Sequence, residues 1–198
     1  MTDGIADAKR ALRAELRERR QQRSDAARTA AAEGVKAQLD ALVASVGARS
    51  ISCFLSAPTE PGTHEFVADA VRRGIRVLLP VTRADGLLDW VVADPDGDIT
   101  EGLFGMPEPV GEVLSPLAVN DVDLLIVPAA AVDGTGMRLG WGRGYFDKTL
   151  GSMEHCPPVY AVVFDSELVD EVPRDLHDQP VTGVVTPTRT VVLAPHRR

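Results

Sequence analysis

The hydrophobic pattern at the start of the chain predicts a helix. Leu12 and Leu16 lie four positions apart, and the residues around them are good helix formers without glycine or proline. We therefore expect a helix over residues 7–22. On that helix four cations would form one basic stripe, namely Lys9, Arg13, Arg17 and Arg20.

A second helix is expected directly afterwards. Ser24 or Asp25 can cap its first turn, and Gly47 marks its end. Between them apolar residues recur at spacings of three and four, at Val35, Leu39, Leu42, Val43 and Val46. Residues 1–47 are thus predicted to form an N-terminal helical arm that packs on the rest of the protein.

From residue 51 onward, short apolar segments between turn signals predict a sheet. Strands over 51–55 and 75–81 flank a helix over 63–73 that Gly74 would close as a left-handed cap. This βαβ order implies a parallel pair of strands. Further strands are expected at 87–93, 124–127, 159–164, 181–185 and 190–193.

Length and composition indicate one α/β domain over residues 1–198. The chain has 198 residues, with 44% hydrophobic and 25% charged, which is close to the average of globular domains and supports a packed core. The strands at 124–127 and 159–164 are continuously apolar, which is typical of the buried centre of a mainly parallel sheet. No repeat or long linker divides the chain.

Charge and composition also exclude several classes of function. A net charge of −8 argues against non-specific nucleic-acid binding, which depends on a basic surface. No apolar run approaches the roughly 18 residues that span a bilayer, so we expect a cytoplasmic protein without a membrane partner. Cys53 and Cys156 are too few and too far apart for a zinc site or a disulfide framework.

The chemistry is concentrated in one segment after the strand at 124–127. Five glycines occur there within eleven positions, at 134, 136, 140, 142 and 144. Their backbone N–H groups can converge on an anion, and a helix beginning near Tyr145 would add its unpaired N–H groups. Arg138, Arg143 and Lys148 supply positive charge. The alternative is a flexible turn, but interleaved cations favour a phosphate site.

Known phosphate motifs do not match this segment. A Walker A loop ends in Gly-Lys-Ser/Thr, whereas Gly144 is followed by Tyr145. The dinucleotide fingerprint would need a third glycine at position 145. Spacing alone therefore predicts a polyphosphate ligand without identifying it.

Residues 138–148, with the sequence RLGWGRGYFDK, closely resemble the signature of the 5-formyltetrahydrofolate cyclo-ligase family, also called 5,10-methenyltetrahydrofolate synthetases. Four other regions match in order and spacing: the first helix with Lys9 and Arg13, residues 54–60 with Thr63, residues 105–109, and residues 172–178. The resemblance implies a three-layer α/β/α sandwich. It also implies an enzyme that converts 5-formyltetrahydrofolate and MgATP to 5,10-methenyltetrahydrofolate, ADP and phosphate.

The need for ATP follows from the chemistry of this reaction. The formyl oxygen is a poor leaving group, so ring closure by N10 requires that oxygen to be activated. If it attacks the γ-phosphate of ATP, a phosphate ester forms, and phosphate leaves when N10 attacks the carbon. Catalysis then consists mainly of alignment and charge neutralisation, without a protein nucleophile.

The resemblance assigns two sets of residues to ATP. The nucleotide would be bound by Lys9, Arg13, Arg138, Leu139, Gly140, Trp141, Gly142, Arg143, Gly144, Tyr145 and Phe146. Arg143 and Lys148 are the candidates that stabilise charge on the transferring phosphoryl group. From the sequence alone, Lys9 and Arg13 would instead be interpreted as a solvated basic face.

Metal and folate ligands also follow from the resemblance. Asp147 and Asp178 match Mg²⁺ ligands, although the first could be a helix-dipole contact and the second a turn cap. Asp133 is a third, weaker candidate. The folate substrate would contact Leu55, Glu60, Trp141 and Tyr145. At Phe146 and Trp141 the chain departs from the residues usual in the family, which could alter the pterin or phosphate contacts.

Two other kinds of function remain open at this stage. A phosphotransferase or sugar-phosphate isomerase could share the α/β/α architecture, because a fold alone does not determine function. A non-catalytic nucleotide- or folate-binding protein could keep the phosphate site. We expect a monomer whose partners are 5-formyltetrahydrofolate and ATP, with no nucleic-acid partner.

Overall fold

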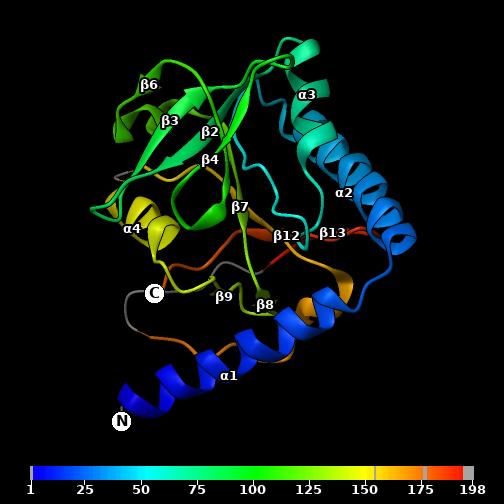
Figure 1. The fold of residues 1–198 in the computed structure, drawn as a ribbon, viewed down its shortest axis with the longest axis vertical. Coiled ribbons are helices and arrows are strands. Elements are labelled where there is room, and N and C mark those ends of the chain that lie inside the picture. Colours follow the sequence, from blue (N-terminus) through cyan, green and yellow to red (C-terminus); the bar gives the residue numbers. More distant parts are fainter. Residues whose placement is uncertain (1, 154, 176–177, 194–198) are drawn as a thin grey trace.

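A computed structural model describes residues 2–153, 155–175 and 178–193. Its centre is an eight-stranded sheet in the order β13-β12-β10-β7-β1-β2-β3-β6 (Figure 1). The strands are β13 (Thr190–Val192), β12 (Gly183–Val185), β10 (Val159–Val162), β7 (Leu124–Pro128), β1 (Ser50–Ser52), β2 (Arg76–Thr82), β3 (Leu88–Val92) and β6 (Val113–Leu114).

The pairing confirms the predicted mainly parallel sheet. The neighbours β12, β10, β7, β1 and β2 run parallel, with Ile51 of β1 opposite Val77 of β2. β13 and β3 pair antiparallel at the two sides. The predicted strand over 51–55 is shorter than expected. β1 ends at Ser52, and the carbonyl of Phe54 accepts a hydrogen bond from the Thr63 hydroxyl rather than from a neighbouring strand.

Helices cover both faces of the sheet, which confirms the three-layer α/β/α arrangement. α2 (Asp25–Val46) and α3 (His64–Arg72) pack on one face, and α4 (Tyr145–Ser152) with the 3-10 helix η2 (Pro116–Asp121) packs on the other (Figure 1). Side chains of β7 alternate between the two layers. Leu124 and Ile126 face the α2 side, while Leu125 and Val127 face the α4 side.

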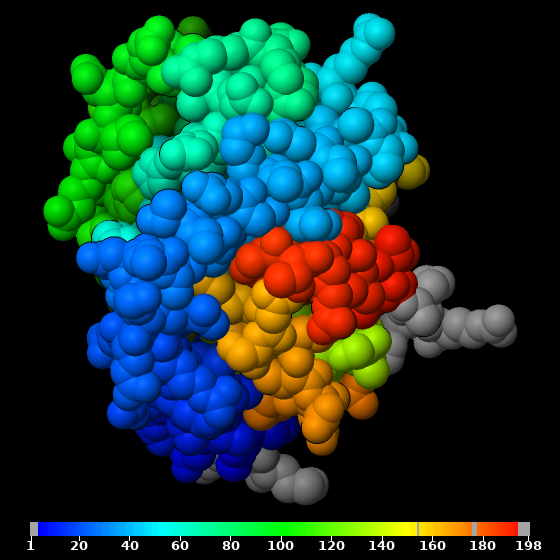
Figure 2. Space-filling view, turned by 90° about the vertical axis from the view of Figure 1, so that its right-hand side faces the viewer, coloured from blue at the N-terminus to red at the C-terminus, as the bar shows by residue number. Residues whose placement is uncertain are grey.

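The two N-terminal helices form as predicted. Ser24 caps α2 by accepting a hydrogen bond from the Ala27 amide, and Gly47 ends it in the left-handed conformation at φ +68°. α1 (Thr2–Gln21) begins earlier than the predicted residue 7. It lies across one end of the sheet, below α2 and beside the orange segment around residues 165–175 (Figure 2).

Two small sheets were not predicted. β8 (Ala131–Asp133), β9 (Arg138–Leu139) and β11 (Leu168–Val169) form a three-stranded sheet within and beside the glycine-rich segment. β4 (Ile99–Glu101) and β5 (Pro107–Pro109) form a hairpin. Between these two strands lies η1 (Leu103–Gly105), in which Phe104 takes a positive φ of 65°. A further 3-10 turn, η3 (Asp165–Glu167), precedes β11.

α1 is fixed through its apolar face. Leu16 is completely buried and packs with Ala130, Leu139 and Val172, next to the small β8-β9 sheet. The basic stripe of α1 therefore faces the glycine-rich segment. Among the described helices, none has both the length and the apolar character that crossing a bilayer requires.

Candidate active site

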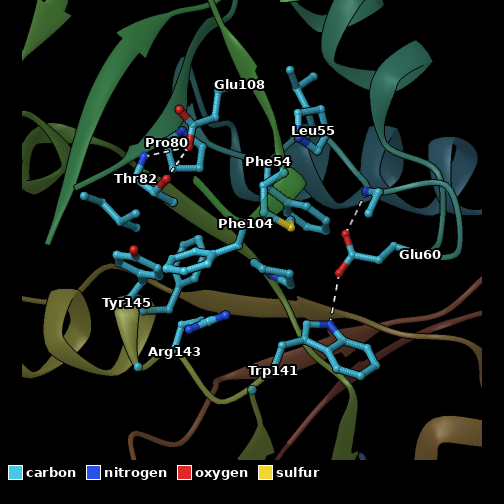
Figure 3. A pocket seen from close by; sticks show the side chains of 18 of the residues that line it. Phe54, Leu55, Glu60, Pro80, Thr82, Phe104, Glu108, Trp141, Arg143 and Tyr145 are labelled. Carbon is cyan, nitrogen blue, oxygen red and sulfur yellow. Dashed lines mark hydrogen bonds between the residues drawn. The ribbon is translucent and has the colours of Figure 1, made fainter. Parts of the chain in front are cut away.

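Two adjoining cavities lie where the parallel strands end. The first has a volume of about 420 Å³ and is called the aromatic cavity, because Phe54, Phe104, Trp141, Tyr145 and Phe146 line it (Figure 3). The second has a volume of about 820 Å³ and is called the basic cavity, because Lys9, Arg13, Arg138 and Lys148 line it. Arg138, Gly140, Gly144 and Asp147 border both cavities. A ligand in one cavity can therefore meet a ligand in the other across this shared wall.

Apart from Asp133, every residue that the sequence assigned to a site lines one of these cavities. The aromatic cavity contains Leu55, Glu60, Arg138, Gly140, Trp141, Arg143, Gly144, Tyr145, Phe146 and Asp147. The basic cavity contains Lys9, Arg13, Arg138, Leu139, Gly140, Gly142, Gly144, Asp147, Lys148 and Asp178. The fold thus brings together positions from both ends of the chain. Parallel strands explain this, because their carboxyl ends meet at one edge of the sheet.

The glycine-rich segment opens with a turn that Asp133 holds. Its Oδ1 accepts hydrogen bonds from the amides of Thr135 (2.8 Å) and Met137 (3.1 Å) and from the Thr135 hydroxyl, and its Oδ2 accepts one from the Val172 amide (3.0 Å). Burial alone would raise the pKa of this carboxyl, but these hydrogen bonds outweigh burial and hold the pKa below its usual value. Asp133 therefore has a structural role at the turn and lines neither cavity.

The end of the segment approaches α1 closely. Gly142 and Gly144 have φ values of +97° and +72°, which glycine adopts without steric cost. Arg13 Nε donates to the Gly140 carbonyl at 2.7 Å. A side chain at Gly142 would begin 3.4 Å from the Arg13 guanidinium carbon, so the backbone here lies against that cation. α4 begins directly afterwards at Tyr145, as predicted.

Each of the two predicted metal ligands forms an ion pair with a basic side chain of the protein. Asp147 Oδ1 accepts from Arg138 at 2.6 Å, and Asp178 Oδ2 accepts from Lys9 at 2.5 Å. Arg13 lies close to both carboxylates. Its pKa is lowered by partial burial and by the neighbouring Arg17, against the opposite effect of Asp178 and Asp147. Acidic and basic groups therefore alternate around the basic cavity.

The two predicted catalytic cations lie on different sides of the shared wall. Lys148 lines the basic cavity, and its Nζ lies against the turn at Gly86, where an added Cβ would be only 2.2 Å away. Arg143 lines the aromatic cavity instead, with its guanidinium carbon 3.6 Å from the centre of the Phe104 ring. Neither side chain forms an ion pair with another described residue. Both charges remain available to a ligand.

The aromatic cavity has a fixed carboxylate on one side. Glu60 is 8% exposed and accepts hydrogen bonds from the Ala57 amide at 2.9 Å and the Trp141 indole N–H at 3.0 Å (Figure 3). Burial raises the pKa of Glu60, although these hydrogen bonds and the charge of Arg20 act in the opposite direction. Glu60 thereby sets the position of the Trp141 ring. The Tyr145 hydroxyl donates to the Arg83 carbonyl at 3.1 Å.

Arg20 lies next to both Glu60 and Trp141. It is 1% exposed and binds Glu167 with two nitrogens, at 2.7 and 2.8 Å. Its guanidinium carbon lies 4.7 Å from the centre of the Trp141 ring, and its Nη1 lies 3.9 Å from Glu60 Oε1. That Nη1 is buried without a hydrogen-bond partner among the described residues. α1 therefore borders both cavities, with Lys9 and Arg13 at the basic cavity and Arg17 and Gln21 at the aromatic cavity. Arg20 lines neither cavity and packs against the Trp141 ring.

Sequence reasoning missed several residues of the site. The sequence predicted the basic stripe of the first helix, but it gave no function to Arg17 and Arg20. Glu108 lies in the segment 105–109 that matched the family, and Phe104 lies directly before it, yet nothing in their spacing indicated that they line a cavity. Within the described parts of the chain, no cluster of three His, Cys, Asp or Glu residues could hold a metal ion by itself.

Comparisons with known proteins identify the family of this chain. The model of the 5-formyltetrahydrofolate cyclo-ligase family matches residues 5–187. A 5-formyltetrahydrofolate cyclo-ligase of Mycolicibacterium smegmatis is 35% identical over 190 residues, covering 93% of this chain and 96% of the relative. The enzyme of the same name from Escherichia coli is 34% identical over 149 residues, covering 73% and 81%.

Solved structures show the same fold. The 5,10-methenyltetrahydrofolate synthetase of Aquifex aeolicus superposes with a TM-score of 0.78 at 26% sequence identity, covering 96% of this chain and 95% of that one. A synthetase of this type from Mycoplasma pneumoniae gives 0.69 at 18% identity, covering 90% and 98%, and supports the fold alone. With the family model matching most of its length, the chain belongs to the 5-formyltetrahydrofolate cyclo-ligase family.

Proposed function

We propose that this chain carries out its family's reaction, the ATP-dependent conversion of 5-formyltetrahydrofolate to 5,10-methenyltetrahydrofolate, with ATP phosphates in the basic cavity and folate in the aromatic cavity. The single observation that carries this arrangement is the shared wall. Arg138, Gly140, Gly144 and Asp147 border both cavities, so the two reacting groups can meet there. Reaction between two bound substrates requires such contact.

The basic cavity suits a triphosphate. Lys9, Arg13 and Lys148 surround it, and the backbone of Gly142 and Gly144 faces it without side chains. The N-terminus of α4 begins at the same place, where unpaired N–H groups favour an anion. We assign these groups, with Arg138 and Leu139, to ATP.

The aromatic cavity suits a flat, partly apolar ring system. Leu55 and Phe146 supply apolar walls, while Trp141 and Tyr145 supply ring faces. We assign these residues and Glu60 to folate. Phe146 carries no hydroxyl, and it packs with the apolar layer between the sheet and α4. The Trp141 ring is held between Glu60 and Arg20.

Reaction at the shared wall needs no protein nucleophile. The formyl oxygen attacks the γ-phosphorus, ADP leaves, and a phosphate ester forms at the formyl carbon. N10 then attacks that carbon, loses its proton, and phosphate departs with the former formyl oxygen. We assign to Lys148, in the basic cavity, and to Arg143, in the aromatic cavity, the stabilisation of charge on the phosphoryl group.

The residues present fit a magnesium ion bound together with ATP. Asp147 and Asp178 border the basic cavity, and each uses one carboxylate oxygen for a cation while its other oxygen accepts no hydrogen bond within the described parts of the chain. Mg²⁺ in ATP-using enzymes takes one or two carboxylates and completes its shell with phosphate oxygens and water. When bound, it would neutralise charge on the phosphates.

We propose a cytoplasmic monomer that acts without nucleic acid or membrane, in keeping with the net charge of −8 and the lack of an apolar run long enough to span a bilayer. Two alternatives can be separated from this proposal by activity. A phosphotransferase or sugar-phosphate isomerase would act on phosphate ligands without a pterin, and a binding protein would retain ligands without turnover.

The direct experiment follows methenyl product by its absorbance with 5-formyltetrahydrofolate, Mg²⁺ and ATP. We expect product only when all three are present. ATP turnover on a different acceptor, with none on the folate, would favour the phosphotransferase. Binding of both ligands without product would favour the binding protein.

A further inference from the structure

Four carboxylates are buried in the described parts of the chain, and one of them has neither a cation partner nor a full set of hydrogen bonds. Glu60 and Glu167 lie beside Arg20, and Asp133 accepts four hydrogen bonds. Glu108 is 6% exposed but has no cation within ion-pair distance in the described structure. Buried carboxylates are normally paired with a cation or fully hydrogen-bonded, because removing the charge from water is costly. Glu108 is therefore the exception.

The described residues donate hydrogen bonds to only one carboxylate oxygen of Glu108. Its Oε1 accepts the Thr82 amide at 2.9 Å and also the Thr82 hydroxyl. Its Oε2 accepts no hydrogen bond from any residue that the structure describes. A carboxylate offers about four acceptor positions, so roughly half of the capacity of Glu108 is unused.

Glu108 borders the aromatic cavity, where a bound ligand could supply the missing donor. Glu108 and Thr82 both line it, and Figure 3 shows them beside Pro80, apart from the pair of Glu60 and Trp141. The hairpin is shaped around this carboxylate. A Cβ at Gly102 would lie 2.0 Å from the carboxyl carbon of Glu108, so only glycine leaves room for it there. The missing donor is therefore expected from a ligand in the cavity.

We propose that Glu108 is a substrate-binding residue whose Oε2 accepts a hydrogen bond from the 2-amino-4-oxopyrimidine end of the reduced pterin. The inference rests on the proposed function, because it places folate in the aromatic cavity. That end of the ring carries two adjacent N–H donors, the 2-amino group and N3–H. A buried carboxylate prefers such donors to water or to an apolar group.

The position of the reacting group selects this end of the ring. The formyl group on N5 must reach the wall shared with the basic cavity, which Glu108 and Thr82 do not line. The 2-amino group is the part of the pterin most distant from N5 and C6. A pterin with its formyl group at the shared wall therefore presents its amino end to the opposite part of the cavity, where Glu108 lies.

Glu60 differs from Glu108 in this respect. Each Glu60 oxygen already accepts one protein donor, from Ala57 or Trp141, and Arg20 lies behind it. Glu60 thus shapes the cavity by holding the indole ring. Glu108 is proposed to accept a hydrogen bond from the ligand itself. Removing the 2-amino donor of the pterin should therefore weaken binding through Glu108 but not through Glu60.

The test measures binding by calorimetry to 5-formyltetrahydrofolate and to its analogue with a 2-methyl group in place of the 2-amino group. The wild type should bind the analogue at least about tenfold more weakly, the loss expected for one hydrogen bond to a charged group. Glu108→Gln should bind 5-formyltetrahydrofolate at least about tenfold more weakly than the wild type, because its amide NH2 group would face the N–H donors of the pterin. This variant should also bind the two compounds with affinities within about threefold of each other.

Two further variants make the assignment specific. Glu101→Gln, on the facing strand of the same hairpin and exposed, should keep wild-type affinity for both compounds. Glu108→Asp keeps the charge and withdraws the carboxylate by one methylene, so it should also lose the preference, and it replaces Glu108→Gln if that variant does not fold. ATP affinity should stay within about twofold in every variant.

Failure of this inference can be separated from failure of the proposed function. A wild type that converts 5-formyltetrahydrofolate but binds both compounds equally contradicts the role of Glu108 alone, as does a Glu108 variant that keeps the wild-type preference. Loss of the preference in Glu60→Gln alone would transfer the role to Glu60. A wild type that binds with the predicted preference yet forms no methenyl product contradicts the proposed function, while binding of neither compound contradicts both.

Discussion

Lys9 in the first helix and Asp178 near the other end of the chain form an ion pair of 2.5 Å, although 169 positions separate them. The side chains are 14% and 15% exposed and border the basic cavity. The pair holds α1 against the segment that follows β11. α1 is therefore a wall of the basic cavity, the proposed nucleotide site, rather than a peripheral arm, and its cations can be tested as such.

Lys9→Ala should raise the KM for ATP at least about tenfold, because a partly buried charged contact contributes about 1.5–3 kcal/mol. Steady-state kinetics with varied ATP provide the measurement. Arg10→Ala is the matched control, since Arg10 lies next to Lys9 but its side chain is 77% exposed and pairs only with Asp7 among the described residues. Equal effects of the two substitutions would contradict a specific role for Lys9.

Lys148→Ala and Arg143→Ala should each lower kcat at least about tenfold, because each removes one charge that is proposed to stabilise the transferring phosphoryl group. Single-turnover formation of methenyl product is the appropriate measurement, as it isolates chemistry from product release. Lys36→Ala serves as control, since Lys36 pairs with Asp40 and Asp69 away from both cavities. Unchanged rates in both site variants would refute their assigned roles.

Arg20→Met should lower the free energy of unfolding by about 3–5 kcal/mol, because it leaves Glu167 buried without its cation. Urea denaturation gives this value. Arg23→Met is the control. Arg23 stacks on the Phe164 ring and forms a solvent-exposed hydrogen bond with Ser166, so its removal should cost less than about 1 kcal/mol. If the two variants are equally stable, Arg20 does not anchor α1 as described.

Stability should also depend on pH through Asp133. The pKa of the Asp133 carboxyl is lower in the folded state than in the unfolded state. As the pH falls, this carboxyl is therefore protonated first in the unfolded chain, which favours unfolding. The contribution of Asp133 is fully present above about pH 4, the ordinary range of the carboxyl, and is lost at lower pH as the folded pKa is passed. Asp133→Asn should be less stable by about 1–3 kcal/mol at pH 7 and less sensitive to acid. Parallel acid-denaturation curves for the two proteins would contradict this account.

Local pattern was sufficient to predict the main elements of the fold. The run at 124–127 became the central β7, and Ser24 and Gly47 cap α2 as their side-chain and backbone chemistry indicated. The predictions failed where pairing is short and non-local. β8, β9 and β11 contain two or three residues each, too few for a periodicity, and their register depends on contacts with α1 and the C-terminal region.

The site was predictable to the extent that a local motif carried it. The glycines and cations of 138–148 predicted a phosphate site, and the structure shows that these residues line two adjoining cavities. Phosphate binding itself stays a prediction. Roles that depend on burial could not be predicted from spacing. Arg20 and Lys9 belong to the same stripe, yet one is 1% exposed against Glu167 and the other borders a cavity. Glu108 was likewise indistinguishable from any solvated glutamate until its burial was known.

A structure of the protein with a non-hydrolysable ATP analogue, Mg²⁺ and 5-formyltetrahydrofolate tests the central claim most directly. We expect the phosphates in the basic cavity among Lys9, Arg13 and Lys148, and the pterin in the aromatic cavity with its formyl oxygen in contact with the γ-phosphate beside Gly140 and Gly144. Phosphates bound outside the basic cavity, or a formyl oxygen out of contact with the γ-phosphate, would contradict the proposed arrangement.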